Sequence, residues 1–300
     1  MTTAYETAVI GLGAMGHGMA ASCLRAGLRT YGFDVVPAHV ERFVAAGGET
    51  GPLQEIAPTL DAAVIVVLNA EQTEDVLFGA SPLVPQMKPG AVVLACATVA
   101  PEFARAMAAR CGEYGVHYLD APVSGGTGRA AQGALSIMAA GTGAAFDAAR
   151  PALDAMAETV FEMGEEAGAG SAMKAINQML VGIHIAATAE ALTFGMTQGV
   201  DPETFTRIIP KCAGTSWALE DRAPHIVAGD YTPLSQVNIW PKDLGIVLDI
   251  AKSAQFSAPV TAAAMQQFLA AAGMGLGRED DAAVARVYAR NAGLTLPGEA

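Results

Sequence analysis

The first half of the chain alternates short apolar segments with helical or turn-rich ones, and this alternation stops near residue 165. Segments of this kind are typical of β-strands, and they lie at Thr7–Ile10, Thr30–Phe33, Ala63–Leu68, Ala91–Leu94, Val116–Leu119 and Leu135–Ala139. Strands that alternate with helices form βαβ units, in which helices cover both faces of a parallel sheet. We therefore expect an α/β fold with a Rossmann-type N-terminal domain over residues 1–165.

The second half of the chain has the pattern of helices only. Aspartate at an N-cap and proline in a first turn favour helix starts, and both occur repeatedly here. The expected helices are Ser171–Gln198, a segment after Asp201-Pro202, Pro241–Lys252, Pro259–Ala271 and a last helix opened by Asp280. We expect an all-α C-terminal domain over residues 166–300, opened by a long interdomain helix.

The start of that long helix is almost entirely apolar. The segment Gly168–Ala189 contains one fixed ionic charge, Lys174. Apolar residues recur at helical spacing and predict a wide buried stripe of Met173, Ile176, Leu180, Ile183 and Ala187. Burying an ammonium costs several kcal/mol unless other groups compensate, although a lysine in a first turn can also extend its amine to solvent.

The neighbours of Lys174 favour a functional role. Asn177 and Gln178 follow it by three and four residues, so the lysine and two carboxamides share one helix face. Carboxamides donate and accept hydrogen bonds, and they suit a bound carboxylate or hydroxyl. We predict a small polar site on the first turns of this helix, in a cleft between the two domains.

A glycine-rich segment directly follows the first predicted strand. In Gly11-Leu12-Gly13-Ala14-Met15-Gly16, the first glycine allows a tight turn, the second lets the backbone approach a pyrophosphate, and the third permits close helix packing. We assign all six residues to a dinucleotide site, together with Leu68 and Asn69 at the end of the third predicted strand.

Asp34 ends the second predicted strand, 23 residues after Gly11. An acidic side chain there can accept hydrogen bonds from an adenosine ribose diol, whereas Val35 and Val36 offer no arginine for a 2′-phosphate. The sequence therefore predicts NAD as the cofactor. The alternative is an ordinary turn aspartate.

The segment Asp120-Ala121-Pro122-Val123-Ser124-Gly125-Gly126 leaves a predicted strand and enters a loop. Ser124, Gly125 and Gly126 supply a hydroxyl and two backbone amides, which can form a nest for a substrate carboxylate. A simple Gly-Gly turn is the alternative interpretation.

Charge and cysteine content exclude several classes of protein. A net charge of −13 and a pI near 4.7 argue against nucleic acid or an anionic membrane as a partner, so anionic substrates need a local pocket. Four separate cysteines without a CxxC pair indicate neither a zinc cluster nor a disulfide framework. We expect a cytoplasmic protein without a signal peptide, because the N-terminus lacks a basic region, and without a membrane span.

Four motifs together resemble the β-hydroxyacid dehydrogenase family, which includes 3-hydroxyisobutyrate, tartronate semialdehyde and 6-phosphogluconate dehydrogenases. They are GLGAMG at 11–16, DAPVSGG at 120–126, GAGSAMKAINQ at 168–178 and KDLG at 242–245. They occur in the family's order and span nearly the whole chain. The resemblance implies a Rossmann-type domain followed by a helical domain that often forms the dimer contact.

The same resemblance implies roles for individual residues. Lys174 is expected to be the general acid/base, and Ser124, Gly125 and Gly126 to hold the substrate carboxylate. Thr98 is expected near the nicotinamide, and Lys242 near the cofactor and active site. Hydride would leave a carbinol carbon while Lys174 takes the hydroxyl proton, which requires its pKa to fall through burial. No metal is needed. Lys242 would assist as a second cation, or simply cap its helix.

Two departures from the family pattern narrow the substrate. Gln178 stands where the family usually has asparagine, and Ala95-Cys96-Ala97 stands where it usually has Asp-Ser-Ser. The chain is most similar to the L-threonate dehydrogenase branch, in which a glutamine also follows the lysine by four. This implies oxidation of a four-carbon acid sugar at its 2-hydroxyl. His184 and Trp217 are candidates to line the pocket, although both have ordinary packing roles as alternatives.

Several alternatives stay open from the sequence. Within enzymes, they are a dehydrogenase for 3-hydroxyisobutyrate, another 3-hydroxy acid or a β-hydroxy amino acid, and a tartronate semialdehyde-type reductase. Retention of Lys174 argues against an imine reductase, and the lack of extra basic or reader segments argues against a non-catalytic NAD-binding module. The apolar long helix predicts a homodimer or homotetramer, because so much apolar surface is unfavourable in water.

Overall fold

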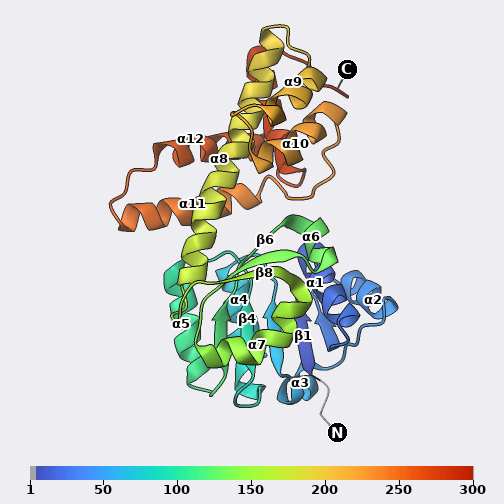
Figure 1. Ribbon diagram of the computed structural model, residues 1–300, viewed down its shortest axis with the longest axis vertical. Coiled ribbons are helices and arrows are strands. Elements are labelled where there is room, and N and C mark those ends of the chain that lie inside the picture. The colour runs from blue at the N-terminus through green and yellow to red at the C-terminus, as the bar shows by residue number, and fades with distance from the viewer. Residues whose placement is uncertain (1–4, 300) are drawn as a thin grey trace. The chain divides into compact units, whose positions relative to one another are not determined.

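The strand and helix alternation of the first half forms a parallel sheet (Figure 1). The structure, a computed structural model, describes residues 5–299. Within them, a five-stranded sheet has the order β2-β1-β3-β4-β5, with all neighbouring pairs parallel. Its strands are β1 (Glu6–Ile10), β2 (Arg29–Phe33), β3 (Ala62–Ile65), β4 (Val92–Ala95) and β5 (His117–Asp120). All five carboxyl ends therefore lie at one edge, as predicted for a Rossmann-type fold.

Helices cover both faces of this sheet. They are α1 (Ala14–Arg25), α2 (Pro37–Ala45), α3 (Leu53–Ile56), α4 (Ala70–Phe78), α5 (Pro101–Gly112), α6 (Gly126–Gln132) and α7 (Gly143–Met156), with 3₁₀ turns at Ala57–Thr59 and Val84–Gln86. One core contains Met19 of α1 and Leu153 of α7, and a second contains Leu77 of α4 and Met107 of α5. Every residue of β3 and β4 is buried, as expected for strands covered on both sides.

A small second sheet accompanies the parallel one. Its order is β6-β7-β8, with β6 (Val123–Ser124) antiparallel and β8 (Ala157–Glu162) parallel to β7 (Leu135–Ala139). The strand β7 was predicted, but β6 and β8 were not. β6 has only two residues, and no position of β8 is fully buried, so neither strand leaves a recognisable apolar pattern.

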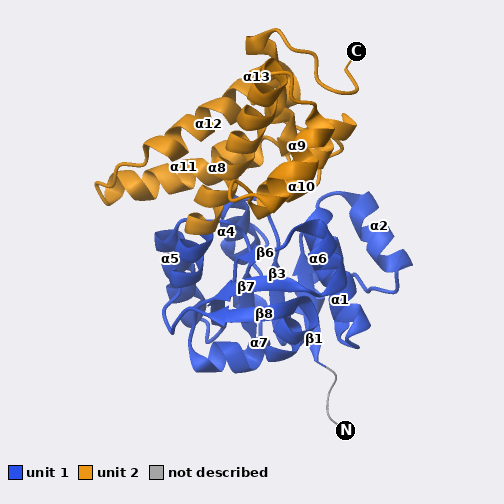
Figure 2. Cartoon of the chain, turned by 45° about the horizontal axis from the view of Figure 1, so that its top comes forward, with its two compact units in different colours: residues 1–174 blue, residues 175–300 orange. Residues whose placement is uncertain are grey.

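The predicted long helix is α8 (Ala169–Thr197). The chain divides into two units, residues 1–174 and 175–300, so α8 begins in the first and continues in the second (Figure 2). The prediction of a buried stripe is wrong for the single chain, because Ile176 and Leu180 are 53% and 50% exposed. The helix is apolar on nearly all sides, and the periodicity could not indicate which side its own chain covers. Among residues 5–299, α8 alone has the length and apolar composition of a membrane span, with 39% of that window buried.

The second unit is helical. It contains α9 (Pro202–Ile208), α10 (Trp217–Ala228), α11 (Ile239–Ser253), α12 (Pro259–Ala271) and α13 (Ala285–Ala292), with 3₁₀ turns at Ile209–Lys211 and Asp281–Val284 and a π-helical turn at Ala272–Leu276. Asp201 and Asp280 cap helix starts as predicted. The helix α10, capped by Ser216, was not predicted. Pro241 lies in the first turn of α11, where a backbone N–H has no intrahelical partner and its loss costs little.

A buried ionic cluster joins three of these segments. Arg222 of α10 donates from Nε to Asp281 Oδ1 at 2.6 Å, and Trp240 of α11 donates from Nε1 to Asp281 Oδ2 at 2.9 Å. Burial raises the pKa of Asp281, and Arg222 opposes that shift. His225 lies 3.4 Å from the neighbouring carboxylate of Asp280. The cluster fixes the start of α11 against α10.

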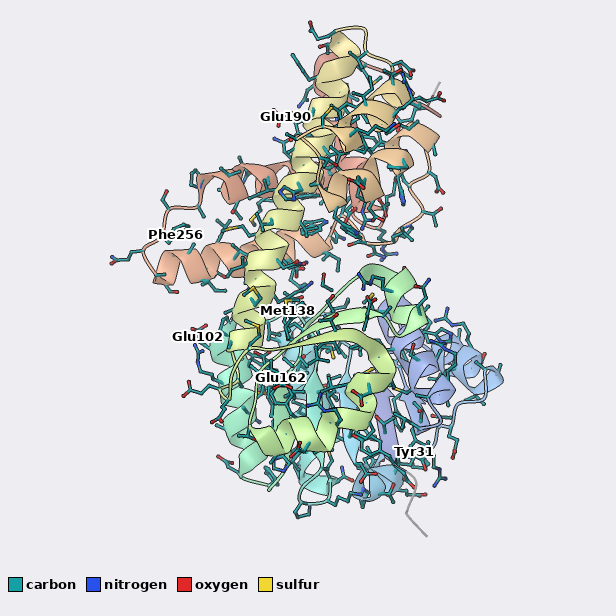
Figure 3. The ribbon with its side chains drawn as sticks, viewed as in Figure 1. Tyr31, Glu102, Met138, Glu162, Glu190 and Phe256 are labelled. Atoms are coloured by element: carbon teal, nitrogen blue, oxygen red, sulfur yellow. The ribbon has the colours of Figure 1, made fainter. Side chains whose placement is uncertain are left out.

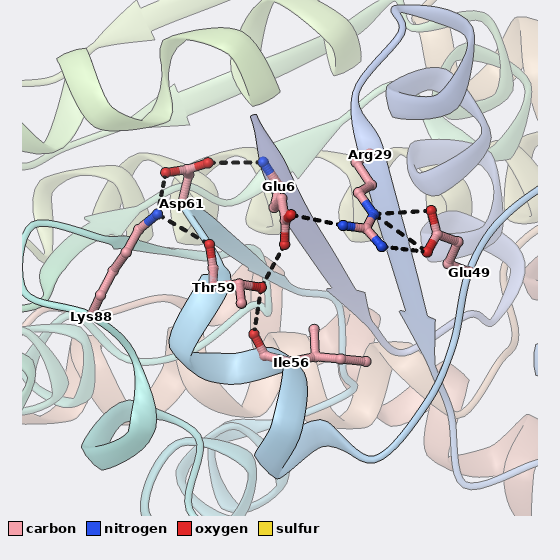
Figure 4. Close-up of polar contacts among 7 residues, drawn as sticks. All are labelled: Glu6, Arg29, Glu49, Ile56, Thr59, Asp61 and Lys88. Atoms are coloured by element: carbon pink, nitrogen blue, oxygen red, sulfur yellow. Dashed lines mark hydrogen bonds and ion pairs between the residues drawn. The ribbon is translucent and has the colours of Figure 1, made fainter. Parts of the chain in front are cut away.

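A polar network closes the amino edge of the parallel sheet (Figure 4). Arg29 pairs with Glu6 at 2.9 Å and Glu49 at 3.0 Å, and Lys88 pairs with Asp61 at 2.6 Å. The backbone N–H of Glu6 donates to Asp61 at 2.8 Å, which ties β1 to the start of β3. These partly exposed pairs each contribute little, and they lie at the edge opposite to the strand carboxyl ends.

Candidate functional site

The glycine-rich turn lies at the carboxyl end of β1. Gly11 has φ +96°, and a Cβ there would lie 2.2 Å from the Val66 carbonyl oxygen. A Cβ on Gly16 would lie 1.8 Å from the Gly11 carbonyl oxygen, so both positions require glycine. A Cβ on Gly13 would meet nothing within 4 Å. The backbone of Gly13 is therefore open to an approaching group, at the N-cap of α1 whose first turn contains Ala14 and Met15.

Asp34 closes this turn from the end of β2. Its Oδ2 accepts from the Leu12 N–H at 2.6 Å, and its Oδ1 accepts from the Val36 N–H at 2.8 Å. Burial alone would raise the pKa of Asp34, but these hydrogen bonds and His39, 3.1 Å away, outweigh it and lower the pKa. The carboxylate is thus held ionised beside the glycine turn. This arrangement fits an acceptor for ribose hydroxyls and opposes a 2′-phosphate.

Two residues of α2 at this turn were missed from the sequence. His39 contacts Asp34, and Arg42 donates from Nη2 to the Leu12 carbonyl at 3.2 Å. Both come from the helix that follows β2, and no local motif marks them. Only the packing of α2 against the glycine turn shows their position.

Other predicted residues lie at the same sheet edge. Leu68 follows β3 and is exposed, and Asn69 caps α4 by accepting from the Gln72 N–H at 2.8 Å. The Gln72 side chain accepts in return from the Leu68 N–H at 2.9 Å. Thr98 follows β4 and is partly buried. The predicted cofactor residues of the first unit thus follow the carboxyl ends of neighbouring strands, where α/β sheets bind ligands.

The predicted carboxylate nest lies at the turn between β6 and α6. Ser124 pairs with Ser136 of β7, and Gly125 and Gly126 follow with φ +131° and +71°. Both values favour glycine, because other residues rarely adopt them. The loop therefore has the backbone conformation that a Gly-Gly turn requires, with the Ser124 side chain partly exposed.

Asp120, at the end of β5, anchors the start of α8. Its Oδ2 accepts from the N–H groups of Gly168 and Ser171, each at 2.8 Å, and its Oδ1 accepts from Ser171 Oγ at 2.6 Å. Burial raises its pKa although these hydrogen bonds oppose the shift. A Cβ on Gly170 would lie 2.3 Å from the carbonyl oxygen of Met138, labelled in Figure 3, so the first turn packs directly on strand backbone.

This anchored turn positions Lys174, three residues beyond Ser171. Lys174 is 8% exposed, as predicted, and its side chain is not extended into open solvent. The role of Asp120 was missed, although the aspartate at the strand end was visible in the motif. The hydrogen bonds span 48 and 51 residues, which no local pattern reveals.

The polar residues of the second unit form a chain of contacts. Asn177 Nδ2 donates to Gln178 Oε1 at 3.0 Å, and Gln178 Nε2 donates to Asp243 Oδ2 at 2.5 Å. Asp243 Oδ1 lies 2.5 Å from Lys242 Nζ. Gly182 of α8 allows α8 and α11 to pack this closely, because a Cβ on Gly182 would lie 2.9 Å from side-chain atoms of both Trp240 and Leu244 of α11. The structure thus joins three predicted residues through Asp243, which was not predicted as a site residue.

His184 and Trp217 are the two residues predicted from the sequence as candidates to line the pocket. His184 is partly buried in α8, where its carbonyl accepts from Thr188 Oγ1 at 2.7 Å. Trp217 is the exposed first residue of α10. A pocket-lining role for either residue stays a prediction. Among residues 5–299, no group of three or more His, Cys, Asp or Glu side chains could hold a metal ion.

Comparison with known proteins places this arrangement in a family. Residues 6–164 match the family model for the NAD-binding domain of 6-phosphogluconate dehydrogenase. Residues 168–288 match the model for the NAD-binding region of NADP-dependent 3-hydroxyisobutyrate dehydrogenase. The chain belongs to the β-hydroxyacid dehydrogenase family. It is an NAD-dependent hydroxyacid dehydrogenase, which confirms the predicted fold class, cofactor and type of reaction.

Individual members of the β-hydroxyacid dehydrogenase family are similar over nearly the whole chain. L-threonate dehydrogenase of Cupriavidus necator is 48% identical and covers 97% of this chain and 98% of its own. The L-threonate dehydrogenase of Escherichia coli K12 is 40% identical, with coverage of 98% and 97%. The crystal structure of 3-hydroxyisobutyrate dehydrogenase from Salmonella typhimurium has a TM-score of 0.89 and 42% identity, and covers 94% of this chain and 99% of that one.

Proposed function

We propose that this dehydrogenase oxidises a four-carbon acid sugar, L-threonate, at its 2-hydroxyl to the 2-oxo acid. The observation that carries the proposal is the carboxamide pair Asn177 and Gln178, held by hydrogen bonds one turn after the buried Lys174. A substrate with several hydroxyls can satisfy such groups, whereas an aliphatic acid cannot. The relatives named L-threonate dehydrogenase, at 40–48% identity, support the same substrate.

Different residues of this chain have different roles in the proposed oxidation. Lys174, in its neutral form, accepts the proton of the reacting hydroxyl as the carbinol carbon loses a hydride. NAD, when bound, supplies the hydride acceptor. The open backbone of Gly13, in the turn that Gly11 and Gly16 allow, would leave room for its pyrophosphate at the start of α1, and Asp34 would accept hydrogen bonds from its ribose. Ser124, Gly125 and Gly126 would hold the substrate carboxylate, Thr98 and Lys242 would help to bind the nicotinamide, and the reaction would need no metal.

We further propose that residues 1–165 form the NAD-binding domain and residues 166–300 the substrate and oligomerisation domain. Exposed apolar side chains of the second unit support a homodimer or homotetramer, because they would otherwise lie in water. They include Ile176, Leu180 and Phe194 on α8, and Phe256 at the end of the α11–α12 hairpin (Figure 3). Light scattering after size-exclusion chromatography would test this, and a monomer at micromolar concentration would contradict it.

A cytoplasmic location is part of the same proposal. All four cysteines are free thiols, three of them buried, as a reducing compartment favours. The net charge of −13 argues against nucleic acid or an anionic membrane as a partner, so a small anionic substrate would be bound by a local pocket.

Initial rates on a panel of acids test the substrate. The panel contains L-threonate, D-glycerate, 3-hydroxyisobutyrate and phenylserine, each with NAD, and NADH formation is followed by absorbance. We expect the highest kcat/KM with L-threonate. The second candidate is 3-hydroxyisobutyrate, favoured by the similarity to the Salmonella typhimurium enzyme of that name. A higher kcat/KM for that acid would overturn the proposed substrate.

A further inference from the structure

Asp243 is buried in the second unit and uses both of its oxygens on neighbouring side chains. It is 2% exposed, with Oδ1 2.5 Å from Lys242 Nζ and Oδ2 2.5 Å from Gln178 Nε2. An ionised carboxylate can accept hydrogen bonds but cannot donate them. The Gln178 amide must therefore direct its nitrogen, and not its oxygen, towards Asp243.

The other end of the amide is hydrogen-bonded as well. Gln178 Oε1 accepts from Asn177 Nδ2 at 3.0 Å. If the amide were rotated by 180°, its oxygen would lie against the carboxylate of Asp243, and its nitrogen would face the donor of Asn177. The contact with the carboxylate would be repulsive, whereas Asn177 can rotate its own amide and accept from that nitrogen. Asp243 therefore holds the carboxamide of Gln178 in one of its two orientations.

We propose that Asp243 is a positioning residue that fixes the Gln178 amide and thereby selects substrates with an oxygen acceptor at this position. With one Nε2 hydrogen committed to Asp243, the second N–H is the donor that the amide offers to a ligand. A hydroxyl oxygen of a polyhydroxy acid can accept it. A methyl group at the same place leaves a buried donor unsatisfied, which sites of this kind reject strongly. This inference rests on the proposed function and names the residue that sets its specificity.

A double-mutant cycle separates this role from a purely structural one. The proteins are the wild type, Asp243→Asn, Gln178→Met and the double variant, because methionine keeps the length of glutamine without its hydrogen bonds. Asparagine keeps the size of Asp243 but can both donate and accept, so it no longer dictates the amide orientation. Asp249→Asn is the matched control, since Asp249 is an exposed aspartate on the same helix. Lys242→Met removes the second partner of Asp243 without changing Gln178.

The readouts are kcat and KM for L-threonate and 3-hydroxyisobutyrate, and the Kd of NADH from fluorescence titration. For Asp243→Asn we expect KM for L-threonate to rise about tenfold, with kcat changed less than about threefold and the Kd of NADH less than about twofold. The preference for L-threonate over 3-hydroxyisobutyrate should fall about tenfold. In the Gln178→Met background the same change should alter that preference less than about twofold. Asp249→Asn should behave as the wild type.

Three outcomes would overturn the inference. The effects of Asp243→Asn and Gln178→Met could multiply in the double variant, which would mean that the two residues act independently. Asp243→Asn could lower kcat equally for both acids, which indicates a structural role. Lys242→Met could reproduce the loss of preference, which would place the effect on the lysine. If the wild type prefers another acid, the proposed substrate fails, and the cycle is then measured on that acid, so the coupling is tested in either case.

Discussion

The two units hold their buried polar residues in different ways. In the first unit, backbone groups do most of the positioning: the N–H groups of Leu12 and Val36 hold Asp34, and those of Gly168 and Ser171 bind Asp120. In the second unit, side chains hold other side chains across long separations, 65 residues for Gln178 with Asp243 and 59 for Arg222 with Asp281. The first arrangement depends on where the chain turns, and the second on which charges are buried together.

This difference predicts different consequences of substitution. A change in the first unit should act through backbone geometry or through direct contact with ligand. A change in the second unit should leave one side chain of a pair buried without its partner. The free energy of unfolding should then fall, and the remaining side chain should lose its fixed orientation.

Replacing Lys174 should have the largest effect on activity. It tests whether the residue that accepts the proton lies at the anchored start of α8. For Lys174→Met we expect kcat to fall about a thousandfold, because the general acid/base is lost, while the Kd of NADH changes little. Stopped-flow or steady-state rates with L-threonate, alongside fluorescence titration of NADH, measure both. Turnover close to that of the wild type would contradict the assigned role.

Replacing Arg222 should have the largest effect on stability in the second unit. Arg222→Met leaves Asp281 buried without its cation, at a cost of about 3–5 kcal/mol in the free energy of unfolding. Burial already raises the pKa of Asp281 above its unfolded value, and removing Arg222 raises it further. The folded variant then binds a proton more tightly than the unfolded chain, so its stability falls as pH rises through that window. Urea denaturation at pH 5 and 7.5 checks this, and we expect the deficit to be smaller at pH 5. An equal deficit at both values would show that Asp281 is not the source.

Two glycines of the first unit form a matched pair. Gly16→Ala should destabilise folding by about 1–3 kcal/mol, because its Cβ would overlap backbone that cannot move aside. Gly13→Ala should leave stability unchanged or raise it by up to about 1 kcal/mol, since φ is −61° and the space is open. NADH binding to Gly13→Ala should still weaken by about tenfold through the added methyl. Thermal melts without cofactor, followed by NADH titration, distinguish the two. Equal melting temperatures for both variants would remove the distinction.

Weakening the anchor of α8 should destabilise folding by no more than Gly16→Ala does. Asp120→Asn replaces a carboxylate, which only accepts, by an amide that also donates, opposite two N–H groups. We expect it to lower the free energy of unfolding by about 1–3 kcal/mol. Ser171→Ala loses one hydrogen bond, worth about 1 kcal/mol. Both should also lower kcat, because they loosen the turn that leads to Lys174. Asp249→Asn serves as the control for a lost aspartate charge. If kcat stays unchanged while stability falls, Asp120 does not position the lysine.

The sequence allowed much of the first unit to be predicted; in the second unit it indicated Asn177, Gln178 and Lys242 but not Asp243, which joins them. The strand alternation, the glycine turn and Asp34 are local features, so their spacing predicts the parallel sheet and the NAD site at its edge. Lys174 stood out because it is the one charge in an apolar segment. Asp243 and Arg222 lie in ordinary amphipathic helices, and their partners are distant in sequence. No local pattern marks such pairs, and the exposed side of α8 could not be identified because nearly every side of that helix is apolar.

The four cysteines differ in exposure, so their reaction with a thiol reagent reports unfolding. Cys23, Cys96 and Cys111 are buried, and burial raises the pKa of each to about 12, so they stay protonated and shielded while the protein is folded. Cys212 alone among the four is exposed. A maleimide dye should therefore attach at one position in the native protein and at four after denaturation. Counting the attached labels by mass spectrometry would follow opening of the sheet unit without any engineered tag.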